Sequence, residues 1–109
     1  MKSINFNKIE KRYLTVTLND EERTTLLIMS PTKKVLESLM EIESISKYNE
    51  ANDDQIDLLY DVCATVMSRN KGGIKISKEK LEGIFDTEDI IIFFDGYMQF
   101  MNEQMASKN

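Results

Sequence analysis

The sequence has no histidine and only one cysteine, Cys63, among its 109 residues. The absence of histidine removes the commonest general base, the commonest transition-metal ligand and the base of Ser-His and Cys-His nucleophile pairs. A single cysteine can form neither an intrachain disulfide nor a structural zinc site, and it is typical of a reducing compartment. We therefore expect a non-enzymatic protein without a metal or other cofactor.

Glycine, positive charge and long apolar runs are also scarce. The four glycines lack the spacing of a phosphate-binding loop. A formal net charge of -5 argues against an electrostatic grip on nucleic acid or anionic lipid. No run approaches a membrane span, and the amino terminus lacks the apolar stretch of a signal peptide. We expect a cytoplasmic protein with no nucleic-acid and no membrane partner.

Apolar residues make up 41% of the chain, enough for the core of a single domain spanning residues 1–109. The segment Arg12–Leu18 alternates apolar and polar residues, which is typical of a strand with one apolar face. The β-prone segment Thr24–Ser30 follows after about five turn-forming and charged residues. The pattern predicts an antiparallel β-hairpin over about residues 12–30, with its pairing register left open.

Helical spacing and capping residues predict the rest of the chain, about residues 31–105. Ser30 as N-cap with Pro31 in the first turn begins a helix that runs to about Tyr48. Its expected buried stripe is Val35, Leu36, Leu39, Met40 and Ile42. Further helices should run from Asn52 or Asp53 to Arg69, from Ser77 to about Phe85, and from Asp86 to about Met105.

The expected fold is therefore α+β and mainly α, with three to four helices and an N-terminal antiparallel β-hairpin. A two-stranded hairpin is marginal alone and must rest its apolar face on helices. We expect the first and last helices to provide that support, with the hairpin contributing Leu14, Val16, Leu26 and Ile28.

The last predicted helix carries more apolar surface than one buried stripe requires. Five large apolar residues, Ile90–Phe94, stand in a row, and the apolar arc covers roughly half of the helix, with Ile92 nearly opposite its centre. Most of the arc is explained by a central position in the core, and the remainder is a hypothetical protein-partner surface. Methionine side chains adapt to changeable surfaces, so the candidate partner residues are Ile92, Met98, Phe100, Met101 and Met105.

Two segments, "RYLTVTLNDEERTTLLIMSPTKKVLESL" and "CATVMSRNKGGIKISKEKLEGIFDTEDIIIFFDGYMQFM", resemble the tail assembly chaperones of long-tailed bacteriophages and prophages of Gram-positive bacteria. The shared features are a β-prone segment leading into a "PTKK" helix start, a helix ending at "MSRNK", a basic glycine turn and an acidic-capped apolar helix. These features are helix caps and apolar faces rather than catalytic residues.

The resemblance implies a small, mostly helical, non-enzymatic protein in the host bacterial cytoplasm that is absent from the mature virion. Such chaperones bind the tape measure protein, keep it soluble and help recruit tail tube subunits. Many are also made in a longer, frameshifted form. Self-association into a homo-oligomer is compatible with the broad apolar arc.

A different class of function is also open, namely a small acidic regulatory or inhibitory protein that binds one host protein. It predicts a strongly salt-dependent affinity for a single host partner, whereas a chaperone predicts association with an elongated phage protein. A third class, an enzyme using Asp and Glu with Mg²⁺, would require acidic residues to converge in a pocket.

Overall fold

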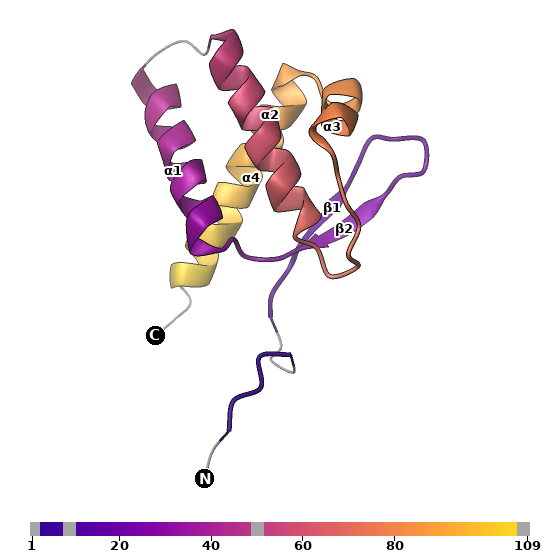
Figure 1. The fold of residues 1–109 in the computed structure, drawn as a ribbon, viewed down its shortest axis with the longest axis vertical. Coiled ribbons are helices and arrows are strands. Elements are labelled where there is room, and N and C mark those ends of the chain that lie inside the picture. The colour runs from indigo at the N-terminus through magenta and orange to yellow at the C-terminus, as the bar shows by residue number, and fades with distance from the viewer. Residues whose placement is uncertain (1–2, 8–10, 49–51, 107–109) are drawn as a thin grey trace.

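The computed structural model describes residues 3–7, 11–48 and 52–106; for residues 45–48 and 104–106 only the backbone is described. These residues form a two-stranded antiparallel hairpin followed by four helices (Figure 1). The expected fold, α+β and mainly α with an N-terminal hairpin, is confirmed.

The hairpin consists of β1 (Leu14–Thr17) and β2 (Thr25–Ile28), paired so that Leu14 lies opposite Ile28. Leu26 and Ile28 are fully buried, while the threonines of the other face are exposed. The alternation that predicted the strands therefore separates a core face from a solvent face. The strands are shorter than the expected segments because the connecting loop is longer than five residues.

The hairpin loop is held by Asp20. Its carboxylate accepts hydrogen bonds from the Thr24 hydroxyl at 2.6 Å and the Thr24 backbone N–H at 2.8 Å. These two bonds, with a smaller contribution from the Lys80 ammonium 3.1 Å away, lower the pKa of Asp20 to about 2. The loop is thus fixed locally, and Lys80 ties it to the helix that carries this lysine.

The helices are α1 (Lys33–Tyr48), α2 (Asp53–Ser68), α3 (Lys78–Ile84) and α4 (Thr87–Ala106). Asn52 and Gln55 form a capping box at the start of α2. The Ser77 hydroxyl accepts from the Lys80 N–H at 3.0 Å before α3, and the Asp86 carboxylate accepts from the Asp89 N–H at 2.8 Å before α4. The expected boundaries of these three helices are confirmed.

The start and the buried stripe of α1 differ from expectation. The helix begins after Thr32, whose hydroxyl accepts from the Val35 N–H at 3.3 Å, so Ser30 is not the N-cap and Pro31 is not in the first turn. The Ser30 carbonyl instead accepts two hydrogen bonds from the Arg69 guanidinium, at 3.0 and 3.2 Å, which holds this segment extended. Met40, expected in the stripe, is 57% exposed.

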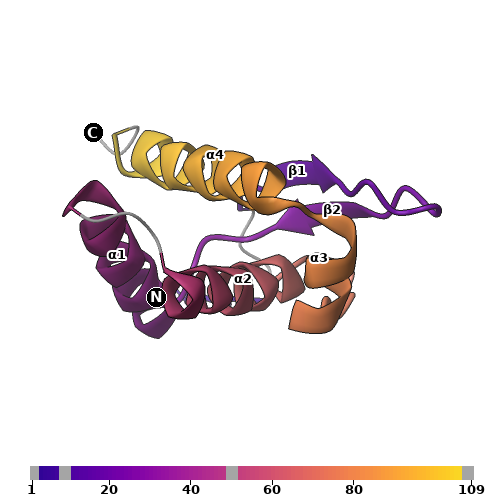
Figure 2. The ribbon, with the colours of Figure 1, turned by 90° about the horizontal axis from the view of Figure 1, so that it is seen from above.

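The central helix of the molecule is α2, which packs against α1, α3, α4 and β2. Seen from above, α2 and α4 form two layers, with the hairpin between them at one end and α1 at the other (Figure 2). The expectation that α1 supports the hairpin is therefore wrong, because α2 stands between them.

The chain just after α2 explains this arrangement. Asn70 forms a β-bridge with Ile28, the Met29 N–H donates to the Arg69 carbonyl at 2.9 Å, and the Lys71 N–H donates to the Leu27 carbonyl at 2.9 Å. The carboxyl end of α2 is thereby fixed to the outer edge of β2. The edge of β2 that faces away from β1 is occupied.

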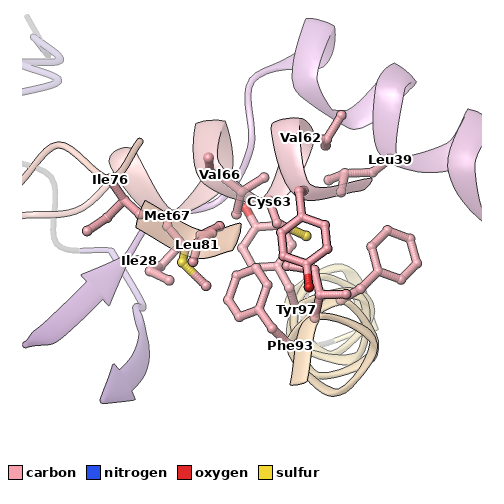
Figure 3. Packing of buried hydrophobic residues seen from close by; sticks show 14 of the residues in the cluster. Ile28, Leu39, Val62, Cys63, Val66, Met67, Ile76, Leu81, Phe93 and Tyr97 are labelled. Atoms are coloured by element: carbon pink, nitrogen blue, oxygen red, sulfur yellow. The ribbon is translucent and has the colours of Figure 1, made fainter. Parts of the chain in front are cut away.

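The core lies between α2 and α4 and continues to the hairpin and α3 (Figure 3). Tyr97 of α4 is 1% exposed, lies between the rings of Phe93 and Phe100, and donates its hydroxyl hydrogen to the Met29 carbonyl at 2.8 Å. Cys63 of α2 is 0% exposed, as its place on the inner side of that helix predicts. Burial raises the pKa of both side chains, that of Cys63 to about 12.

Candidate partner-binding groove

The five candidate residues for partner binding do not form one surface. Met98, Phe100 and Met101 are 8%, 6% and 6% exposed, because the apolar arc of α4 is covered within the fold. Ile92 is 63% exposed. Met105 belongs to α4, but its side chain lies outside the described residues. The expectation of a surface that includes Met98, Phe100 and Met101 is therefore wrong for this conformation, while binding by Ile92 stays a prediction.

Two adjacent isoleucines, Ile91 and Ile92, are the exposed large apolar residues of α4 in its described part, at 51% and 63%. Ile92 lies in the wall of a groove of about 370 Å³ between the first half of α4 and strand β1. The apolar walls come from three segments of the chain: strand β1, the segment between α3 and α4, and α4 itself. The lining residues are Leu14, Thr15, Val16, Thr17, Asn19, Phe85, Asp89, Ile92, Phe93 and Gly96.

The floor and walls of the groove are fixed by hydrogen bonds to the segment between α3 and α4. The Tyr60 hydroxyl of α2 donates to the Phe85 carbonyl at 2.7 Å, and the Asn19 amide donates to the Ile84 carbonyl at 2.8 Å. Burial, followed by the nearby carboxylates of Asp86 and Asp89, raises the pKa of Tyr60 and keeps its hydroxyl protonated as a donor. The groove is thus part of the folded structure rather than a gap beside a loose loop.

One side of the groove is the unpaired edge of β1. The Leu18 N–H donates to the Thr24 carbonyl at 2.8 Å, and the register makes Val16–Leu26 and Leu14–Ile28 the other hydrogen-bonded pairs. The backbone N–H and C=O groups of Thr15 and Thr17 must therefore point away from β2. Within the described part of the chain no hydrogen bond occupies these four groups. A free edge beside an apolar groove is a template for an added strand.

The edge of the groove is acidic. Asp89 is in its wall, Glu88 precedes it in the first turn of α4, and Asp86 caps the start of that helix. The Asp86 and Asp89 side chains cap each other's backbone N–H groups at 2.8 and 3.1 Å, so the two negative charges are fixed at this end of the groove. A segment that docks here should therefore be apolar with positive charge nearby.

The basic run Arg69–Lys80 is largely engaged within the chain. Lys78 pairs with Asp57 at 2.6 Å, which raises the pKa of the lysine, and Lys80 pairs with Asp20. The Lys71 ammonium lies 5.6 Å from the centre of the Tyr13 ring, within reach of a cation–π contact. These contacts support the fold and use charges that a polyanion would otherwise bind.

Sequence reasoning identified Ile92 but missed the groove beside it. Leu14 and Val16 were expected to pack on the first and last helices, and both are half-buried beside the groove. Gly96 was the one local signal, since a glycine in the middle of a helix often marks close approach or open space; a Cβ added there would meet nothing within 4 Å. That signal names no partner element, so it could not have located the groove.

Among the residues whose structure is described, no group of three or more acidic or cysteine side chains is arranged to hold a metal ion. No helix in those same ranges is long and apolar enough to span a membrane. Comparisons with family models, with curated proteins and with solved structures found no match to this chain.

Proposed function

We propose that the protein is a tail assembly chaperone of a long-tailed bacteriophage or prophage, a non-enzymatic protein that binds the tape measure protein, keeps it soluble and helps recruit tail tube subunits. The resemblance over residues 12–39 and 63–101 supports this role. It includes the "PTKK" helix start and the acidic-capped apolar helix that forms one wall of the groove. The protein acts in the host bacterial cytoplasm and is left out of the mature virion.

The observation that carries the proposal is the apolar groove bordered by a free strand edge. A chaperone for a very long polypeptide must bind many unrelated segments rather than one sequence. Backbone hydrogen bonds to a strand edge are independent of the client's side chains, and apolar walls accept side chains of varied shape. The negative charge of the whole protein, -5, keeps the loaded complex in solution.

Co-expression tests the proposal directly. The chain is produced together with the longest helix-rich protein encoded downstream of its own gene, and the soluble fraction of that protein is measured. We expect the long protein to become soluble and to co-purify with the chain. Ile92→Glu places a charge in the groove wall and should reduce recovery of the long protein at least tenfold.

The matched control is Met40→Glu. Met40 is exposed to a similar degree, 57% against 63%, but lies on α1, at the other end of α4 from the hairpin (Figure 2). It should leave recovery unchanged. Equal loss in both variants would contradict a role for the groove, and an insoluble long protein in the presence of the wild-type chain would contradict the chaperone function.

Gene order gives an independent test. We expect an overlapping reading frame after a slippery run near the stop codon, followed by a very long gene. Mass spectrometry of purified virions should find the tape measure and tail tube proteins but not this chain. A flanking repressor, toxin or metabolic operon would contradict the proposal, and so would the chain in virions.

The acidic regulator is separated from the chaperone by a pull-down from host lysate free of phage proteins. The chaperone predicts no stoichiometric host partner. A host protein retained in equal amount, and released as salt rises, would favour the regulator and overturn the proposal.

A further inference from the structure

The N-terminal arm, residues 3–7, is a second feature without a place in the fold. It extends away from the helices and the hairpin (Figure 1). Ile4 and Phe6 are 74% and 72% exposed, the highest values among the large apolar residues of the described chain. The hydrogen bond described within the arm is local, because the Asn7 N–H donates to the Asn5 side chain at 3.0 Å. Within the residues that the structure describes, no packing contact explains why these two large apolar side chains are exposed to solvent.

The amino-terminal segment that contains the arm, residues 1–12, and the remainder of the protein carry opposite charge. Residues 1–12 contain four basic side chains and one acidic side chain, a net charge of +3. Since the whole chain has a net charge of -5, residues 13–109 carry -8. The groove opens beside the acidic start of α4, with the capping residue Asp86 and the first-turn residues Glu88 and Asp89. The charge of residues 1–12, on either side of the arm, is therefore complementary to the surroundings of the groove.

We propose that the groove between β1 and α4 binds the N-terminal arm of a second copy of this chain. The arm adds a strand to β1, hydrogen-bonding to the free backbone groups of Thr15 and Thr17. Ile4 and Phe6 are two residues apart, so in an extended arm both side chains face the same side. That side is the apolar wall formed by Phe85, Ile92 and Phe93.

A second copy is the occupant, rather than the chain's own arm, because the arm lies outside its own groove. Residues 3–7 extend away from the helices and the hairpin, with Ile4 and Phe6 in solvent (Figure 1). If each copy gives its arm to the other, both grooves are filled and a closed two-fold dimer results.

Arm exchange accounts together for three exposed apolar residues, Ile4, Phe6 and Ile92, which the isolated chain leaves in water. It does not depend on the chaperone function, because it needs only the purified chain. Where a client also uses the groove, client and arm compete, and the arm covers the groove until a client arrives.

Sedimentation of the full chain over a range of concentrations tests the exchange. We expect a monomer–dimer equilibrium that weakens as salt rises, since opposite charges attract across the interface. Replacing both arm residues, Ile4→Asp with Phe6→Asp, should raise the dimer dissociation constant at least tenfold. The control, Asn5→Asp with Asn7→Asp, adds the same charge to the alternate positions and should raise it far less. A monomer at every concentration, or equal effects of both pairs, would overturn the proposal.

Disulfide trapping identifies which arm occupies the groove. The variants Phe6→Cys and Ile92→Cys are prepared separately, one with ¹⁵N, and mixed under mild oxidation; Cys63 is fully buried and does not interfere. We expect a disulfide between the labelled and unlabelled chains that joins position 6 to position 92. A chain carrying both substitutions that forms this disulfide only within itself would show that the arm folds back, and would overturn the exchange.

Discussion

At the scale of the residue, Asp20 links the charge state of one carboxylate to the stability of the hairpin. Hydrogen bonds from Thr24 lower its pKa from 3.8 to about 2 in the folded chain. A carboxylate with a lowered folded-state pKa stabilises the fold fully above its unfolded-state pKa, and this contribution is lost as the pH falls through the folded-state value. The loss should therefore occur as the pH falls from about 4 to about 2.

The expected result is that wild type loses more stability than Asp20→Asn between pH 4 and pH 2, because only the wild type has this carboxylate to protonate. The measurement is the midpoint of urea denaturation at pH 5, 4, 3 and 2. Parallel curves for the two proteins across this range would show that Asp20 does not carry the linkage.

Single residues of α4 also show what an apolar pattern in the sequence cannot predict. The apolar arc identifies which side chains avoid water but not which neighbouring element covers each of them. Met98 and Met101 share the arc with residues that any helix would bury, and α4 is packed closely enough that both are covered. Ile92 was identified because it lies opposite the arc, where no neighbour is required.

At the scale of the element, α4 has a core face and a groove face that mutation can separate. Met98→Ala or Met101→Ala removes a buried side chain and should lower the free energy of unfolding by about 2–5 kcal/mol. Ile92→Ala alters an exposed side chain and should change it by no more than about 0.5 kcal/mol. Urea denaturation of the three variants is the measurement. A loss at Ile92 equal to that at Met98 would contradict the burial described for α4.

The helix boundaries were predictable because their determinants are local. Asn52, Ser77 and Asp86 each bond to a backbone N–H three residues along the chain, and such spacing is visible in sequence. The start of α1 was not, since the Arg69 guanidinium that binds the Ser30 carbonyl is 39 residues away. Local chemistry fixes where elements begin, and distant contacts can move that point.

The arrangement of the elements could not be predicted for the same reason. The bridge between Ile28 and Asn70 joins segments whose sequences give no sign of pairing. Asn70 is buried, and its side chain bonds to the Met67 carbonyl, the Ile74 carbonyl and the Ile74 N–H at 2.8, 2.6 and 2.9 Å. This junction places α2 at the centre and leaves the edge of β1 open, so the groove depends on it.

At the scale of the whole molecule, α2 joins the parts into one cooperative unit, since α1, α3, α4 and β2 all pack on it. Cys63 lies on the inner face of this helix, and both its burial and its raised pKa of about 12 suppress the thiolate that reacts with alkylating reagents. We expect labelling of Cys63 to require opening of the core. Its rate in increasing urea should rise with the slope of global unfolding, and a rate independent of urea would indicate local access instead.

Because Cys63 is the only cysteine in the chain, its labelling rate reports how often the core opens. A brief pulse of a thiol reagent in a crude cell extract would label the fraction of molecules that open during the pulse, without purification. A partner that binds only the closed form would slow the labelling of Cys63 by the factor by which it lowers the open fraction. The labelling rate of Cys63 can therefore report how much of the protein is bound to a partner in a cell extract.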